Sequence, residues 1–362
     1  MLKLNMKRSK KNILLLVFSI IILALLFATL TTCKEQQEMI SDRNIDMEMF
    51  STGRYVISLP ASAKMVEANL VVSGVPIKIK PDYLKARAIR AAEKEWTSIY
   101  KKNGSNKIQS AEREILPNNA QLLKYNHIRI KGEGLDGSAI DTIVFSTLAY
   151  IWWDNTLFTL GGDGSLNKEN EIKALINKLE AESNDQDESS LCYVTGCISQ
   201  KTGDESLDIN FEISDIANLK AKFQSDQYSG EANSALSERK LSSTLIDLGD
   251  EADWIMKSDY QHHTYRNAKR ISHDLSGEEI IEASVQKSEG NYLIEVNAKW
   301  YYPGIPGVAE KPEITIQLDY SYTVDKKPSS PAGFLDNTAG SDITEADFMH
   351  IWDTALDSFS SR

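Results

Sequence analysis

Strict alternation of apolar and polar residues is the pattern that most constrains the fold of this chain. Ile314–Val324 alternates over eleven residues, and Leu207–Ile213 alternates over seven. Such alternation is typical of antiparallel strands with one face in a core and the other toward water. Ile280–Val285 and Tyr292–Trp300 add a hairpin with a turn between them. We therefore expect a chain rich in antiparallel sheet.

Helical periodicity replaces this alternation in a few stretches. Tyr83–Lys102 and Leu166–Glu182 carry apolar residues at helical spacing, and the chain ends on a helix that opens with a capping box at Thr344–Asp347. The run Gly161–Ser165 before the second helix is expected to be a turn and N-cap, with Ser165 as the capping residue.

The order of these elements predicts the fold class and the domains. The segment Ser225–Glu238 is poor in large apolar residues and is read as a boundary, so the chain should contain an N-terminal domain over 48–228 and a C-terminal domain over 236–362. Strands and helices are segregated in both. We predict an α+β protein of two domains, each an antiparallel sheet with helices packed on it.

The first 33 residues form a leader that predicts the compartment. Five basic residues precede an uncharged stretch whose apolar core is Ile13–Leu30. A basic flank stays cytoplasmic, so the chain after Cys33 is expected in the periplasm. Two modes of tethering to the inner or outer membrane fit this segment. An apolar core of eighteen residues just reaches the length of a spanning helix, whereas Leu30–Cys33 looks like a lipobox with Cys33 as the lipidated residue. A cleaved signal that releases a free domain is the third alternative.

The charge of the exported part limits its partners. It holds 35 basic and 52 acidic side chains, a net charge of −17. This speaks against nucleic acid and anionic lipid surfaces, and it fits a basic protein partner or solubility alone.

The two remaining cysteines, Cys192 and Cys197, are separated by four residues that include a Thr-Gly pair. In an oxidising compartment this spacing predicts a local disulfide across a tight turn, with free thiols as the alternative. A zinc site is not indicated because no second cysteine pair or nearby histidine completes the ligand set.

Sequence patterns of catalysis are lacking. The sequence has no G-x-S-x-G elbow, no H-E-x-x-H and no Walker loop, so we expect no catalytic residues, no metal and no cofactor. Candidate partner contacts are Tyr301 and Tyr302, placed at the end of a strand beside a Pro/Gly loop where at least one ring of Trp300–Tyr302 should be exposed. The acidic cluster of Asp250, Glu251 and Asp253 is a further candidate contact.

Several blocks carry a resemblance to a known family. These are Gly53-Arg54-Tyr55 followed by Leu59-Pro60, then Val72-Ser73-Gly74-Val75, the cysteine turn and a final helix that bears a tryptophan. Together they resemble the Tle cognate immunity protein 4 family, over about residues 48–361. The resemblance implies two α+β domains that bind and inhibit a type VI secretion phospholipase effector in the periplasm, without catalysis. A structural or assembly lipoprotein of the envelope is the alternative function, and a hydrolase built from scattered acids is a third.

Overall fold

The structure is a computed structural model that describes residues 45–103, 111–116, 120–133, 137–181, 190–193, 196–199, 205–227, 260–308, 310–328 and 341–362. The predicted leader with Cys33 and the acidic cluster Asp250, Glu251 and Asp253 lie outside the described residues. None of the helices in the described part is long and apolar enough to cross a bilayer.

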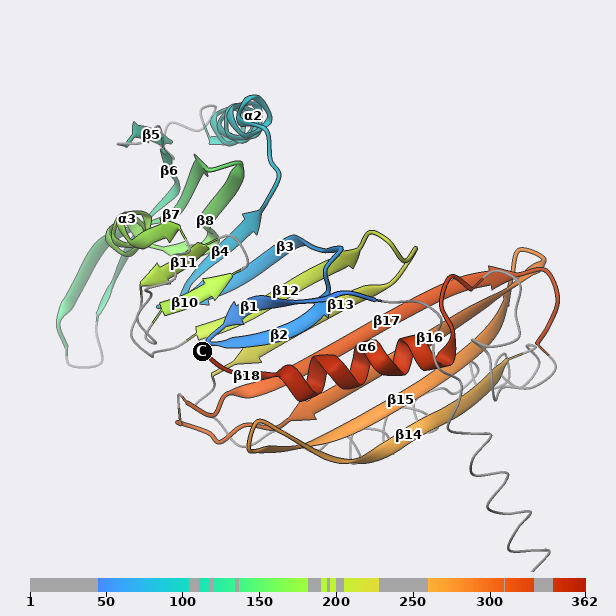
Figure 1. Cartoon of the computed structure of the whole chain (residues 1–362). Coiled ribbons are helices and arrows are strands. Elements are labelled where there is room, and N and C mark those ends of the chain that lie inside the picture. The colour runs from blue at the N-terminus through green and yellow to red at the C-terminus, as the bar shows by residue number, and fades with distance from the viewer. Residues whose placement is uncertain are drawn as a thin grey trace, which may run out of the picture.

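Most described residues belong to two antiparallel sheets (Figure 1). The strands of the larger sheet, in their spatial order, are β14 (Gln261–Ser272), β15 (Leu275–Ser288), β16 (Asn291–Tyr302), β17 (Glu313–Val324), β13 (Lys220–Asp226), β12 (Glu205–Ile213), β3 (Ala63–Val72), β4 (Val75–Lys80), β8 (Thr156–Leu166), β7 (Ala139–Trp153), β6 (Gln121–Glu133) and β5 (Glu112–Ile115). The strands of the smaller sheet are β18 (Ser360–Ser361), β2 (Tyr55–Pro60), β1 (Met47–Gly53), β10 (Ser190–Tyr193), β11 (Gly196–Ser199) and β9 (Leu179–Ala181).

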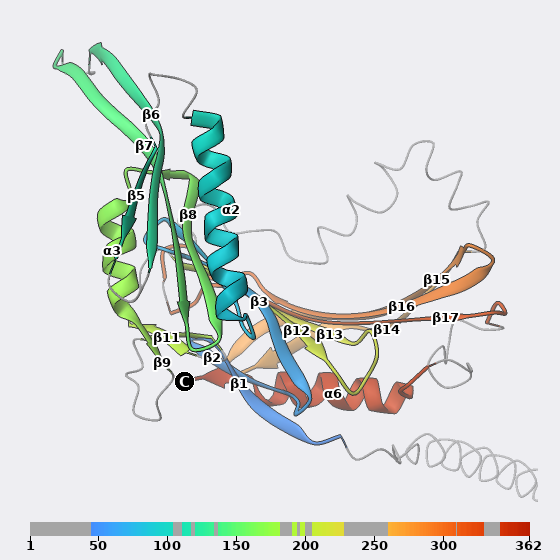
Figure 2. The same ribbon diagram turned by 90° about the horizontal axis from the view of Figure 1, so that it is seen from above.

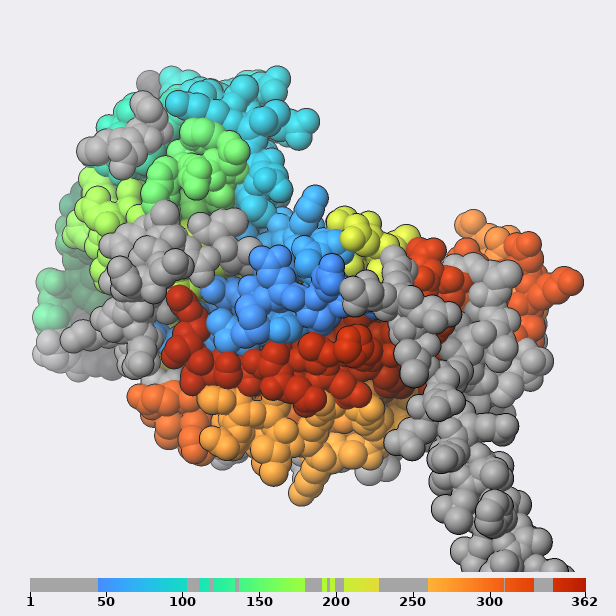
Figure 3. Space-filling view, in the orientation of Figure 1, coloured from blue at the N-terminus to red at the C-terminus, as the bar shows by residue number. Residues whose placement is uncertain are grey.

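Helices are placed on opposite sides of the larger sheet. Viewed from above, this sheet is bent, with α2 (Lys85–Asn103) on the inner side of the bend (Figure 2). On the outer side lie α3 (Glu169–Lys178), α6 (Glu345–Ser358) and the smaller sheet. Figure 3 shows α6 along the outer surface, between the N-terminal strands and β14–β15. The antiparallel α+β class predicted from the sequence is therefore confirmed.

The core follows from strand alternation. Inward positions of adjacent strands match across the sheet; for example Phe223 of β13 pairs with Ile316 of β17, and Ile316 pairs with Trp300 of β16. These side chains are buried against α6 and the smaller sheet, in one cluster that draws residues from both predicted domains. A small second cluster around Ile99 and Leu148 lies beneath α2.

The predicted domains share more than a core. Because β13 pairs with β17 over seven residues, strands from 48–228 and 236–362 are neighbours in one sheet. The division into two domains stays a prediction.

The C-terminal helix is confirmed in detail. Thr344 accepts a hydrogen bond from the Asp347 backbone N–H at 3.1 Å, and the Asp347 carboxylate accepts one from the Thr344 N–H at 2.9 Å, which completes the capping box. The apolar stripe of this helix is buried, including Phe348 and Trp352.

The glycine run behaves differently from its prediction. Residues 161–165 stay within β8, where the pairing register with β7 shifts, and α3 begins only at Glu169 with no side-chain cap. Ser165 is buried in the strand and does not cap the helix. Gly161, next to this register shift, has φ of +85°, and a Cβ there would lie 2.2 Å from the Thr147 carbonyl oxygen, so only glycine fits this position.

Candidate functional site

The polar face of the larger sheet is the strongest candidate for a binding surface. It lies on the inner side of the bend, the side that carries α2 (Figure 2). We call it the inner face. Alternation that sends apolar residues to the core sends their polar neighbours to this face. Its half-buried polar residues on β3, β12, β13, β16 and β17 include Glu67, Asn69, Asp208, Asn210, Lys222, Gln224, Asn297, Gln317 and Asp319.

Acidic groups of the inner face are held by partners on their own strand and on adjacent strands. Asp208 accepts hydrogen bonds from Gln224 at 3.0 Å and Asn210 at 3.2 Å, and forms an ion pair with Lys222 at 2.9 Å. Asp319 accepts from Gln317 at 2.9 Å and also from Asn297. The side chains are thus fixed before any partner arrives, which lowers the entropic cost of binding.

The third such acid is Glu67, bound by Lys78 at 2.7 Å and Asn69 at 3.2 Å. Partial burial raises the pKa of Glu67, but the hydrogen bond and the charge of Lys78 and the Asn69 amide outweigh it, so this pKa falls below its ordinary 4.5. Glu67 therefore stays ionised at neutral pH.

Two adjoining hollows shape this face. One of about 890 Å³ is lined by residues that include Tyr260, His262, Glu282 and Asp319. The other, of about 510 Å³, is lined on β3 and β12, and both hollows share Lys220 and its neighbour Asn218. They form a broad surface rather than an enclosed chamber.

Among the described residues, no group of three or more His, Cys, Asp or Glu side chains could hold a metal ion. His262 contacts Glu282 at 3.2 Å, and His263 packs edge-on against Tyr265, so these adjacent histidines lie on opposite faces of the sheet. The arrangement can bind by hydrogen bonds and charge.

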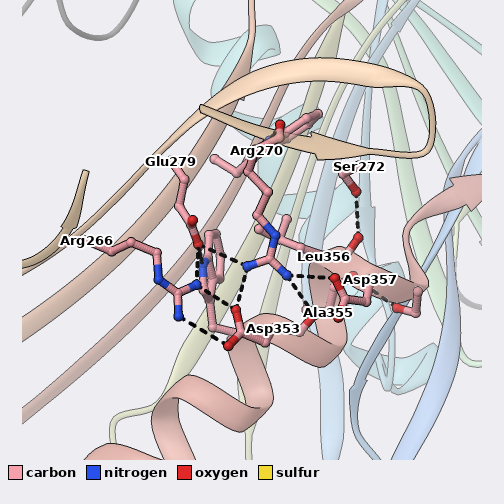
Figure 4. A network of polar contacts seen from close by, with 11 residues as sticks. Arg266, Arg270, Ser272, Glu279, Asp353, Ala355, Leu356 and Asp357 are labelled. Atoms are coloured by element: carbon pink, nitrogen blue, oxygen red, sulfur yellow. Dashed lines mark hydrogen bonds and ion pairs between the residues drawn. The ribbon is translucent and has the colours of Figure 1, made fainter. Parts of the chain in front are cut away.

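The densest charged cluster of the described residues joins α6 to the edge of the sheet (Figure 4). Asp353 of α6 accepts hydrogen bonds from Arg266 and Arg270 of β14, at 2.7 and 2.5 Å. Buried Glu279 of β15 accepts from both arginines and from the Trp352 indole at 2.6 Å. Both carboxylates face several donors, so the cluster clamps α6 onto β14 and β15.

This cluster of Arg266, Arg270, Glu279 and Asp353, which we call the clamp, lowers the pKa of one of its own carboxyl groups. Burial raises the pKa of Asp353, but the hydrogen bonds and charges of the two arginines outweigh burial and lower it below the ordinary 3.8. Clamp residues carry no predicted role in the sequence, since nothing in their spacing distinguishes them from solvated charges.

The structure corrects the prediction for Tyr301 and Tyr302. The strand does not end at Trp300: β16 continues through Tyr302, with β15 or β17 paired beside it, so the aromatics lie within the sheet rather than in a loop. Exposed fractions of the Trp300, Tyr301 and Tyr302 side chains are 0%, 1% and 8%. The expectation that one ring is exposed is wrong, and neither tyrosine is available to a partner.

Cys192 and Cys197 face each other across the β10–β11 hairpin and form a disulfide bond, with Cα atoms 4.0 Å apart. Both are buried beneath the C-terminal end of the chain, where the Arg362 guanidinium contacts the two sulfurs. Strand β18 pairs with β2 next to this contact. The bond therefore ties a short hairpin at the point where the C-terminus returns to the smaller sheet.

The Gly53-Arg54-Tyr55 block forms a structural joint. Gly53 has φ of +74°, and a Cβ there would meet Leu207 at 2.7 Å. Arg54 pairs with buried Glu205 through two contacts of 2.5 and 3.1 Å, and Tyr55 stacks on Phe359 with ring centroids 5.0 Å apart. These residues connect the two sheets to the end of α6.

The fold of this chain is similar to that of solved immunity proteins. The apo form of the immunity protein TplEi of the type VI secretion system of Pseudomonas aeruginosa aligns with a TM-score of 0.52 and 18% identity, over 87% of this chain and 97% of that one. A chain of the Tle4–Tli4 complex aligns with a TM-score of 0.55 and 18% identity, over 87% of this chain and 97% of that one. The chain therefore has the fold of a class of secretion-system immunity proteins.

The particular family is defined by sequence. A family profile described as the Tle cognate immunity protein 4 C-terminal domain matches residues 186–362. The match begins upstream of the predicted domain boundary near residue 228. Residues 186–362 are thus similar to the C-terminal domain of the Tle cognate immunity protein 4 family. No protein with a curated description matches it.

Proposed function

We propose that this chain is an immunity protein that binds and inhibits a cognate type VI secretion phospholipase effector in the periplasm. The observation that carries the proposal is the family match over 186–362, on a fold shared with solved immunity proteins. The inner face supports it, because a broad polar surface with its hydrogen-bond partners already fixed suits a protein partner.

The contact surface in this proposal is the inner face. Its charges are mixed and paired across strands, so a complementary effector surface would be selected by position and sign more than by net charge. Asp250, Glu251 and Asp253 remain proposed contacts as well. The negative charges of these residues would attract a basic effector surface, and association would then slow as salt rises.

Location and anchoring are proposed on the leader. The basic flank and apolar core favour a periplasmic chain tethered either by a spanning helix or by lipid on Cys33. Inhibition would then occur where a secreted effector meets the envelope. The protein acts by occupation of the effector, not by turnover.

The two-domain division also remains a proposal. The family profile begins at residue 186, which supports a C-terminal unit that includes β12 and β13 as well as β14–β17. Cutting the chain near residue 229 would separate β13 from its neighbour β17, so point substitutions test the function better than isolated halves.

The test is a binding and inhibition assay with the lipase encoded beside this gene. The chain should form a stable complex with that enzyme and suppress its hydrolysis of phospholipid, while it hydrolyses none itself. Asp208→Ala and Asp319→Ala should each weaken the complex by about tenfold, the effect of losing one charged hydrogen-bond centre. Glu48→Ala, at an exposed position on β1 of the smaller sheet, is the matched control. Hydrolase activity of the chain alone, or no complex, would contradict the proposal.

A further inference from the structure

The outer ends of β6 and β7 form a hairpin that leaves the body of the protein. Pairing of β6 with β5 stops at Lys124, and pairing of β7 with β8 stops at Ser146. Among the described residues, 127–133 and 139–144 therefore have no third strand on either edge. Figure 2 shows this two-stranded ribbon projecting past α2 and α3. We call it the distal hairpin.

A β-bulge in β6 lies at the base of the distal hairpin. Asn126 has φ of +52°, and the pairing register changes from Tyr125 opposite Ser146 to Ile128 opposite Val144. Such a bulge bends and twists a strand. Below it the Tyr125 hydroxyl donates to Asp163 at 2.9 Å. The direction of the ribbon is thus set by the sheet beneath it.

One face of the distal hairpin has no ionisable group. Strand alternation places three residues of β6 opposite three of β7 on this face: Ile128, Ile130 and Gly132, with Val144, Thr142 and Ile140. The exposed fractions of Ile128, Ile130 and Ile140 are 52%, 45% and 38%. We call it the uncharged face. Exposed aliphatic residues gathered on a projection are typical of an interaction surface.

The opposite face of the distal hairpin carries both basic and acidic side chains. Arg129 donates to Asp141 through two hydrogen bonds of 2.6 and 2.7 Å, and Lys131 and Glu133 lie on the same side. Ile143 on this face is 55% exposed. The two faces of one ribbon therefore differ in chemistry while they share backbone and exposure.

The uncharged face is continuous with the inner face. Tyr125 and Leu148 lie beneath α2, and Val144 follows Leu148 at even spacing along β7. The uncharged face therefore lies on the side of the sheet that carries α2 and the inner face. A partner that covers the inner face near α2 would reach it.

We propose that the uncharged face docks on the apolar surface by which the effector admits acyl chains. This rests on the proposed function. A lipase must offer acyl chains an apolar path, as pockets for apolar ligands do. The uncharged face of this projection complements that path, whereas the inner face is ionic. A bilayer is the weaker partner, because anionic lipid repels an exported part of net charge −17.

Two aspartates on this face test the proposal. Ile128→Asp with Ile130→Asp in the full chain, solubilised in mild detergent, should weaken binding to the purified effector by tenfold or more, since docking would bury the new charges against an apolar surface. The matched control is Ile143→Asp, on the opposite face of the same ribbon, which should change affinity by less than twofold. Circular dichroism and thermal unfolding establish that the variants fold.

The outcomes separate the two ideas. If the unaltered chain fails to bind the effector, the proposed function is wrong. If it binds and the double variant binds equally well, the docking of the uncharged face is wrong. A photo-crosslinking residue at position 130 gives a second readout in cells, independent of variant stability. An adduct with the effector, absent when the crosslinker is at position 143, supports the proposal; an adduct only with lipid or with a second copy of the chain overturns it.

Discussion

Removing the Arg54 charge should leave a buried carboxylate without its cation. Arg54 and Glu205 are joined by two contacts, and their side chains are only 14% and 6% exposed. Arg54→Met keeps most of the apolar stem and deletes the guanidinium. Breaking one partner of a buried ion pair costs about 3–5 kcal/mol of the free energy of unfolding. We expect a loss near the lower end, about 3 kcal/mol at pH 7.5, because a carboxylate at the start of β12 can gain some water.

The same variant should show a particular pH dependence. Burial raises the pKa of Glu205 above 4.5, and the hydrogen bond and charge of Arg54 oppose that rise. Without Arg54 the folded-state pKa rises further above its unfolded value. The variant's penalty is then absent below the unfolded pKa and grows as pH increases through the folded pKa. Its deficit relative to the unaltered protein should be small near pH 5 and full at pH 7.5.

Urea unfolding followed by tryptophan fluorescence at both pH values measures this difference, and thermal unfolding should show a melting temperature lower by about 5–10 °C at pH 7.5. The double variant Arg54→Met, Glu205→Gln has no buried charge, so this site should add no pH dependence to the variant's own free energy of unfolding over this range. A single variant as stable as the unaltered protein at pH 7.5, or a deficit equal at the two pH values, would refute the reasoning.

Three further outcomes are expected. Asp353 has a lowered pKa, so its contribution is present above pH 3.8 and is lost as pH falls through the folded-state value; acid titration of unfolding should show that Asp353→Asn lacks this component. Replacing Cys192 and Cys197 by serine should cost about 2 kcal/mol in urea unfolding, the chain-entropy value for so short a loop, and an unchanged midpoint would contradict a stabilising role. Cys33→Ser should abolish labelling by a fatty-acid analogue if lipid is the anchor, whereas membrane retention without labelling in the unaltered chain would favour a spanning helix.

Local patterns in the sequence predict which elements form, because the physical causes are local. The alternation of 314–324 reappears as β17, and the box at Thr344–Asp347 caps α6. Neighbours in space are another matter. β13 and β17 are adjacent although about ninety residues separate them, and alternation fixes the face of a strand without naming its partner. For this reason the continuous sheet could not be read from the sequence.

The errors have equally physical causes. A proline and glycines after Tyr302 suggested that the strand ends early, but ladder pairing with Thr315 and Ile314 extends it and buries the rings. Gly161 suggested a turn before a helix, but its positive φ lies next to a register shift and the chain stays in β8. In both places a local signal was real, and tertiary pairing decided its use.

The polar positions of alternating strands show why the candidate binding surface could not be predicted from the sequence. Asp208 and Asn210 alternate with core residues and resemble any solvated positions in the sequence. Only the register brings Gln224 and Lys222 against them and turns separate polar residues into one fixed surface.

The distal hairpin shows the converse. Its alternation of isoleucine with basic residues is typical of a half-buried strand, in which Ile128 and Ile130 would face a core. In the structure no second layer among the described residues covers them, and both remain about half exposed. A strand pattern specifies a face that should be buried, and the fold of this chain alone leaves that face open. The missing layer would have to come from a partner, which is why the substitution of these two isoleucines should affect binding more than stability.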